Sequence, residues 1–125
     1  MKNFIIPTQY SKYGNFKTLY NGIMYDSKLE AKYAQQLDLR LRGRDIKHWS
    51  RQVKFPIVVN GEKICTYICD FQIFHNDGSM EFVEVKGNET KEWKLKKKLI
   101  LATFFKEHPK YKFTVLTIKD IDTKF

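Results

Sequence analysis

Apolar residues recur along the chain at two different spacings, which separate its helical segments from its strands. From Leu29 to Leu41 an apolar residue returns every four positions, as on one face of a helix, and Gly43 is suited to end that helix. Later segments are dense in Ile, Val, Phe and Tyr, which favours strands that are buried on both faces. The pattern predicts a helix over residues 27–43, strands over 46–59, 64–74 and 80–86, a helix over 90–107 and a strand over 112–118.

This order predicts an α/β fold with one mixed sheet of about four strands flanked by helices. Because the last strand follows a helix, we expect it to lie parallel to the strand over 80–86, through a right-handed crossover. The chain has 125 residues, enough for one domain over residues 1–125, and residues 1–21 are expected to form an irregular N-terminal arm. Asn21-Gly22 signals a turn, after which residues 23–25 form either a short strand or a hydrophobic staple.

Charged residues occur inside the apolar strands on either side of one tight turn. Asn76-Asp77-Gly78 fits a three-residue hairpin loop, and if His75 pairs with Ser79 across it, the antiparallel register is fixed. Counting back five residues on each side then places Asp70 opposite Glu84, with Cβ atoms ~5 Å apart. Two carboxylates at that distance repel one another, so the register itself indicates a cation between them.

A third carboxylate is expected from the first helix. Glu30 falls on its apolar side, although Ser27-x-x-Glu30 is also a capping box, and the sequence leaves capping and chemistry equally open for this residue. Oxygen ligands from Asp70, Glu84 and Glu30, with the backbone carbonyl of Val85, would suit Mg²⁺ or Mn²⁺ better than zinc.

Lys86 shares a strand face with Glu84 because residues two apart point to the same side. Beside a divalent ion, its amine could position or deprotonate a water, or stabilise a charged transition state. The alternative is an ordinary ion pair between Lys86 and either Asp70 or Glu84. Burying unpaired charge costs several kcal/mol, roughly, which favours the functional interpretation for a cluster in apolar strands.

The net charge of +9 favours a polyanionic partner, with nucleic acid first among the candidates. Lys94 and Lys97 on the second helix, with Arg51 and Lys54 on the first long strand, are predicted to contact DNA phosphates. A solvated helix face is the alternative for the lysines. Contacts with phosphates alone would select DNA by shape rather than by sequence.

The two cysteines and the hydropathy of the chain indicate the compartment in which the protein is expected. Cys65 and Cys69 lie four apart on one predicted strand, so their Cα atoms would be ~13 Å apart and could not form a disulfide. No run approaches the ~20 apolar residues of a membrane span, and no signal peptide begins the chain. We therefore expect reduced thiols in a soluble cytoplasmic protein without a membrane partner. His48 and His75 are expected to serve in packing or at the surface.

The set Asp70…Glu84-Val85-Lys86, with a helical Glu30 before it, resembles the PD-(D/E)XK nuclease superfamily. The strings YDSKLEAKYAQQL, RQVKF, YICDF and EVKG, within about Tyr10 to Phe105, resemble a phage family of small Holliday-junction-resolvase-like endonucleases, the domain of unknown function 1064 type. This resemblance implies a restriction-endonuclease-like core. It also implies metal binding by the acidic residues and a catalytic lysine at Lys86, with Gln52 near the site in contact with water or phosphate. Cys69, where many relatives have proline, departs from the pattern.

The expected function is a Mg²⁺-dependent DNA endonuclease. The resemblance alone implies branched DNA such as Holliday junctions as the substrate, a homodimer, and a role in phage recombination or DNA processing within the host cytoplasm. Two alternatives stay open. One is a transposition-type or site-specific nuclease subunit on the same fold, and the other is a non-catalytic nucleic-acid-binding module.

Overall fold

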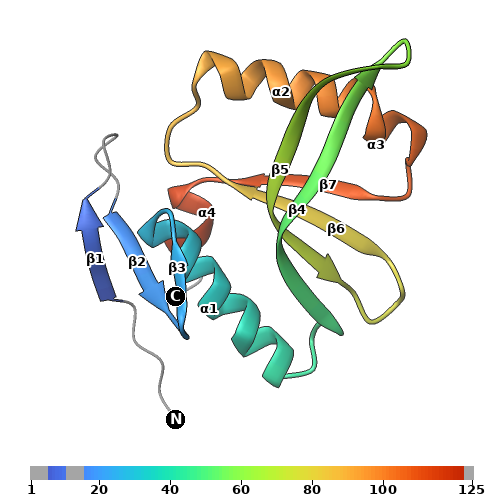
Figure 1. Ribbon diagram of the computed structural model, residues 1–125. Coiled ribbons are helices and arrows are strands. Elements are labelled where there is room, and N and C mark those ends of the chain that lie inside the picture. Colours follow the sequence, from blue (N-terminus) through green and yellow to red (C-terminus); the bar gives the residue numbers. More distant parts are fainter. Residues whose placement is uncertain (1–5, 11–15, 123–125) are drawn as a thin grey trace.

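The computed structural model describes residues 6–10 and 16–122 (Figure 1). It contains two sheets with helices packed around the larger one. The elements are β1 (Ile6–Tyr10), β2 (Phe16–Tyr20), β3 (Ile23–Tyr25), α1 (Lys28–Arg42), β4 (His48–Val59), β5 (Glu62–Phe74), β6 (Met80–Val85), α2 (Lys91–Ala102), α3 (Phe104–Glu107), β7 (Lys112–Leu116) and α4 (Ile118–Asp122).

The larger sheet is mixed and has the strand order β4-β5-β6-β7. β4, β5 and β6 pair antiparallel, whereas β7 pairs parallel with β6, as expected for a strand reached through a helix. This confirms the predicted α/β class with a central four-stranded sheet. Pro56 lies on β4 at the sheet edge, where its missing N–H disrupts no ladder.

A smaller antiparallel sheet of β1, β2 and β3 precedes α1. Asn21 and Gly22 both have positive φ, 51° and 79°, and close a two-residue hairpin between β2 and β3. The predicted irregular arm is therefore wrong for residues 6–10 and 16–20, and residues 1–5 and 11–15 lie outside the described part of the chain. β1 and β2 escaped prediction because, among the described residues, they pair only within this small sheet, and their sequences show little alternation of apolar and polar residues.

The turn between β5 and β6 has the predicted geometry. His75 N donates to Ser79 O at 2.9 Å, Gly78 N donates to His75 O at 3.0 Å, and Gly78 has a φ of 88°. The register runs from these residues to the pair Phe71–Val83. The paired register is therefore as predicted as far as Phe71–Val83, and Asp70 and Glu84 are the next residues on the two strands, just beyond the last pair.

α1 packs on one face of the larger sheet. Ser27 caps its first turn by accepting a hydrogen bond from Glu30 N at 3.1 Å, and Gly43 ends it. We call the apolar residues beneath it the α1-side core: Tyr20, Tyr25, Ala31, Tyr33, Ala34, Leu37, Ile46, Phe71, Ile73, Val83, Val85 and Ile121.

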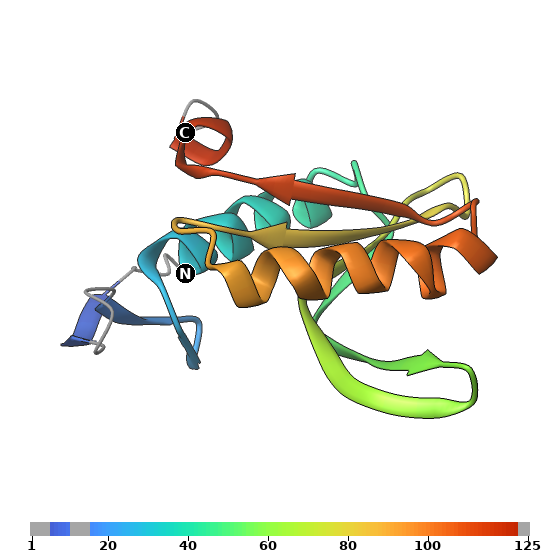
Figure 2. The ribbon, with the colours of Figure 1, turned by 90° about the horizontal axis from the view of Figure 1, so that it is seen from above.

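α2 and α3 pack on the opposite face, as the view from above shows (Figure 2). Their α2-side core consists of Phe55, Ile57, Tyr67, Cys69, Phe82, Ile100 and Phe105. We predicted a single helix over 90–107, but the helix breaks at Thr103, whose hydroxyl donates back to Leu99 O at 2.7 Å. Such a bond competes with the helical ladder and helps the two phenylalanines that follow to turn into the core.

β4 and β5 form a long two-stranded ribbon, and the core in which its inward side chains are buried changes at one position. On β5, Tyr67 and Cys69 belong to the α2-side core, whereas Phe71 belongs to the α1-side core. Residues two apart on a regular strand share a face, so the ribbon must twist sharply at Asp70. Beyond this twist the hairpin curls away from the sheet, over the α2 side (Figure 2).

The chain after β7 forms a short helix where a tail was predicted. Asp120 Oδ2 accepts from the backbone N–H of Thr117 at 2.8 Å, and Ile121 is fully buried in the α1-side core. The predicted tail over 120–125 is thus wrong for residues 120–122, and residues 123–125 lie outside the described part. No helix within the described residues has the length and apolar character to cross a membrane.

Candidate active site

Glu84 is a buried carboxylate near the end of β6, only 3% exposed. The hydroxyl of Tyr67 on β5 donates to its Oε1 at 2.7 Å, and Lys86 Nζ lies 3.2 Å from its Oε2. Burial raises the pKa of Tyr67 far above its ordinary value, and negative charge nearby adds to the effect, so its hydroxyl remains a donor. Both oxygens of Glu84 therefore have partners inside the protein.

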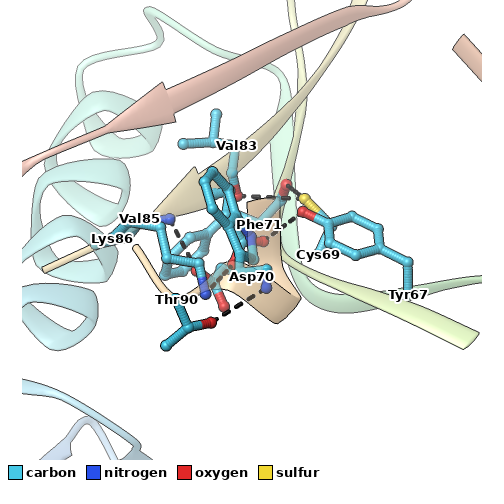
Figure 3. Close-up of polar contacts among 10 residues, drawn as sticks. Tyr67, Cys69, Asp70, Phe71, Val83, Val85, Lys86 and Thr90 are labelled. Carbon is cyan, nitrogen blue, oxygen red and sulfur yellow. Dashed lines mark hydrogen bonds and ion pairs between the residues drawn. The ribbon is translucent and has the colours of Figure 1, made fainter. Parts of the chain in front are cut away.

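Asp70 lies at the twist of β5, within reach of the end of β6. Its Oδ2 accepts a hydrogen bond from Val85 N at 2.8 Å, and Figure 3 shows Asp70, Tyr67 and Lys86 converging there. Burial, followed by the negative charges of Glu30 and Glu84, raises the pKa of Asp70 to about 9. These effects outweigh the Val85 hydrogen bond and the charge of Lys86, so the site favours a neutral Asp70 unless a cation is present.

Glu30 brings a third carboxyl group from the first turn of α1. Burial, then the charges of Asp26 and Glu84, raise the pKa of Glu30 to about 7, against the opposing charges of Arg51 and Lys86. The backbone N–H of Glu30 is the one that Ser27 caps. The residue thus takes part in the cap through its backbone while its side chain interacts with the site, so the two interpretations of the sequence are compatible.

Lys86 follows β6 and has an aromatic neighbour that the sequence did not indicate. Its Nζ lies 5.1 Å from the ring centroid of Trp93, and Lys97 Nζ lies 5.4 Å from the same centroid. Tyr67 was missed as well, although it stands at the start of YICDF. A tyrosine and a tryptophan in apolar segments are ordinary core residues, and only their partners distinguish them.

Gln52 has an unusual backbone, with a φ of 54° in the middle of β4. It lies between the pairs Arg51–Phe71 and Val53–Cys69, opposite Asp70, so the twist of the ribbon passes through both residues. Non-glycine residues avoid this region, and such outliers concentrate at functional sites. The side chain of Gln52 is exposed, so the structure links Gln52 to the site through the backbone opposite Asp70.

The residues predicted to contact DNA are not all alike. Arg51 lies over the ring of Tyr25, 4.6 Å from its centroid, and its charge acts on Glu30. Lys97 is half-buried at Trp93, whereas Lys54 on β4 and Lys94 on α2 are exposed. The exposed pair is free of such packing and remains suited to phosphate contact.

The donor set fits a hard divalent cation. Asp70, Glu84 and Glu30 supply only oxygen atoms, which suit such a cation. Burial and the repulsion among the carboxylates raise the pKa values of Asp70 and Glu30 by more than the nearby positive charges lower them. No group of three His, Cys, Asp or Glu side chains within the described residues is already arranged as a metal cluster. Asp70 is hydrogen-bonded to Val85 N, and Glu84 contacts Tyr67 and Lys86, while the charge of Glu30 raises the pKa of Asp70.

The other end of β6 also carries an acidic residue, in a different setting. Glu81 accepts from Thr114 Oγ1 at 2.6 Å and contacts His75 Nε2 at 2.9 Å. Burial would raise the pKa of Glu81, but these two hydrogen bonds and the charge of Lys112 outweigh it and lower that pKa. A surface depression of about 610 Å³ adjoins this end, lined by His75, Glu81 and Lys112 among others, and it does not reach the Asp70 cluster.

The fold and site define an α/β protein with a mixed sheet and a buried acidic cluster beside a lysine. A family model described as a protein of unknown function (DUF1064) matches residues 10–120, so the chain belongs to that family. No curated protein matches the chain. The family description names no activity, so the nuclease resemblance stays a prediction.

Proposed function

We propose that this protein is a Mg²⁺-dependent endonuclease that hydrolyses DNA phosphodiester bonds, with Mn²⁺ able to substitute. One observation supports this most. Glu84, near the end of β6, is buried, contacts Lys86 and lies near Asp70 of β5, and the negative charge of Glu30 adds to theirs. Three carboxyl groups beside few positive side chains suit a divalent cation. A lysine among them suits phosphodiester hydrolysis.

Each residue has a separable role in this proposal. Asp70, Glu84 and Glu30, with the carbonyl of Val85, would hold the cation, which when bound supplies charge to activate water and offset the negative charge that grows on the phosphate. Lys86 orients or deprotonates the attacking water, or stabilises that growing charge. Tyr67 fixes the orientation of Glu84 through its 2.7 Å hydrogen bond. Gln52, through its backbone, shapes the ribbon opposite Asp70.

The substrate class follows from the charge of the protein and from the resemblance. A net charge of +9 supports a nucleic-acid partner, and Lys54, Lys94, Lys97 and Arg51 are the candidates for phosphate contact. Preference for branched DNA, a homodimeric assembly and a role in phage recombination in the host cytoplasm rest on the resemblance alone. Two symmetric cuts in a junction would require two copies of the site.

Cleavage of a four-way junction and of a linear duplex with Mg²⁺ tests the proposal. We expect wild type to cut DNA, and Asp70→Asn and Lys86→Ala to lose cutting while their circular dichroism stays that of wild type. Variants that cut as well as wild type would contradict this site. Equal cutting of junction and duplex by wild type would leave the nuclease but remove the junction preference.

A non-catalytic nucleic-acid-binding module is a second candidate. The engagement of both Glu84 oxygens, by Tyr67 and by Lys86, favours it, because an ion pair with a hydrogen bond can be a complete structural motif. Salt-sensitive DNA binding by wild type without cutting in Mg²⁺ or Mn²⁺ would support this candidate over the nuclease.

A further inference from the structure

Trp93 lies in the first turn of α2, where its backbone is fixed and its ring is buried. Thr90 caps the helix by accepting from Trp93 N at 3.1 Å, and the residue is 6% exposed. The indole Nε1 is buried without a hydrogen-bond partner among the described residues. A buried tryptophan normally finds a partner for its N–H. Among the described residues, the polar contacts of the Trp93 side chain are therefore made by the face of the indole ring and not by its N–H.

The ring face is turned to two ammonium groups. Lys86 Nζ and Lys97 Nζ lie 5.1 and 5.4 Å from its centroid, within the distance at which the ring quadrupole attracts a cation. Lys86 comes from the end of β6 and Lys97 from the next turn of α2. The ring thus connects the lysine of the acidic cluster to a lysine of the helix that is expected to meet DNA.

Lys86 needs such a partner because its other contact is shared. Its ion pair is with Glu84 Oε2 at 3.2 Å, and Glu84 is also a carboxylate that would hold a divalent ion. A cation near Glu84 would weaken its attraction for the ammonium group, whereas it would not occupy the ring of Trp93. Fixing a long lysine side chain costs conformational entropy, so the contact with the Trp93 ring is needed to hold Lys86 in place once Glu84 binds a cation.

We propose that Trp93 is a positioning residue, whose ring face holds the Lys86 ammonium group at the acidic cluster. Its effect on cleavage rests on the proposed nuclease function, but its effect on Lys86 does not. Because the face rather than the N–H does the positioning, Trp93→Phe should substitute for the indole and Trp93→Leu should not.

The direct readout is the NMR chemical shift of the Lys86 side-chain methylene protons, measured without metal and without DNA. In wild type we expect these protons to be shifted upfield by the indole ring, relative to an exposed lysine such as Lys54. Trp93→Phe should keep most of the upfield shift, and Trp93→Leu should remove it. A wild-type Lys86 that resonates like Lys54 would overturn the proposal, whether or not any variant folds.

Cleavage provides the second readout. Trp93→Leu should lose as much cutting as Lys86→Ala, and Trp93→Phe should stay within a few-fold of wild type. Trp49 provides the matched control: it packs against the α1-side core and its Nε1 donates to Asp38 at 3.1 Å, so Trp49→Leu should lower stability without moving the Lys86 resonances. A folded Trp93→Phe that loses both the shift and the cutting would contradict a role for the ring face.

The two proposals can fail separately. If wild type cuts no DNA but its Lys86 protons are shifted by Trp93, the nuclease fails and the positioning stands. If wild type cuts DNA and Trp93→Leu cuts equally well, the nuclease stands and the positioning by Trp93 is wrong.

Discussion

β6 carries a glutamate near each end, and the two differ in how completely the protein compensates their charge. Glu81 has hydrogen bonds to Thr114 and His75 with Lys112 nearby, and its pKa is lowered. Glu84 has Tyr67 and Lys86, but it shares its surroundings with Asp70 and Glu30, whose pKa values rise to about 9 and about 7. At the Glu81 end, hydrogen bonds and the charge of Lys112 outweigh the effect of burial on the carboxyl pKa. At the Glu84 end, burial and the neighbouring carboxylates outweigh the nearby positive charges on Asp70 and Glu30. We infer that the second end is built for a cation from outside the chain.

The largest expected difference between the ends is in cleavage. Glu84→Gln should lower the rate of DNA cutting by about a hundredfold or more, because it removes charge at the reacting centre. Glu81→Gln, the same substitution on the same strand, should cut like wild type and lose about 1 kcal/mol of folding free energy. Cleavage assays beside urea denaturation would measure both effects, and equal loss of cutting in the two variants would contradict the distinction.

The ends should also respond to pH in opposite ways. A raised folded pKa means that Asp70 and Glu30 hold their protons more tightly when folded, so their contribution is complete below ordinary carboxyl pKa values near 4 and is lost as the pH rises through about 7 and about 9. Glu81, with a lowered pKa, contributes above its ordinary value of 4.5 and loses that contribution as the pH falls.

Urea denaturation of the metal-free protein between pH 4 and pH 9 would separate these effects. Wild type should lose roughly several kcal/mol of stability from pH 5 to pH 9, and Asp70→Asn should lose much less. Glu81→Gln should keep the alkaline loss and reduce only the loss in acid. A wild-type stability that rises steadily to pH 9 would show that Asp70 and Glu30 are not held near neutral form.

Removal of the hydroxyl group that donates a hydrogen bond to each glutamate should have a smaller effect on cutting and stability. Tyr67→Phe removes the hydrogen bond to Glu84, which should cost about 1 kcal/mol of stability and slow cutting roughly tenfold. Thr114→Val removes the corresponding bond to Glu81 and should cost a similar stability with no change in cutting. A Tyr67→Phe variant that loses stability alone would reduce Tyr67 to a structural role.

The smallest effect concerns the twist opposite Asp70. Gln52→Gly replaces a non-glycine residue that has a φ of 54°, and relief of this conformation should raise stability by about 1 kcal/mol. If the backbone is what matters, cutting should be retained. Thermal denaturation and the cleavage assay decide this, since a stable Gln52→Gly without cutting would assign the function to the amide side chain.

The fold and the acidic pair could be predicted because both depend on local patterns. The turn at residues 76–78 determines the register between β5 and β6, and the register places Asp70 beside Glu84 without any knowledge of the remaining fold. The parallel β6–β7 pair was predicted from the order of the elements and is confirmed, and the cap at Ser27, which the sequence left open, is present.

The remaining features depend on contacts between distant elements. Tyr67 reaches Glu84 only because the ribbon changes cores at Asp70, and Trp93 meets Lys86 only because α2 packs beside the end of β6. Neither twist nor packing leaves a periodic signal in the sequence. The same holds for β1, β2 and α4, whereas the turn at Asn21-Gly22 was predicted and β3 was one of two alternatives for residues 23–25.

Crystals soaked with Mn²⁺ would test the central inference most directly, by the anomalous scattering of the ion. We predict a Mn²⁺ peak in contact with both Asp70 and Glu84 in wild type, and its loss in Asp70→Asn crystals. A wild-type map without a peak at this end of β6, or with a peak only beside Glu81 and His75, would contradict the inference that this end is built for a cation.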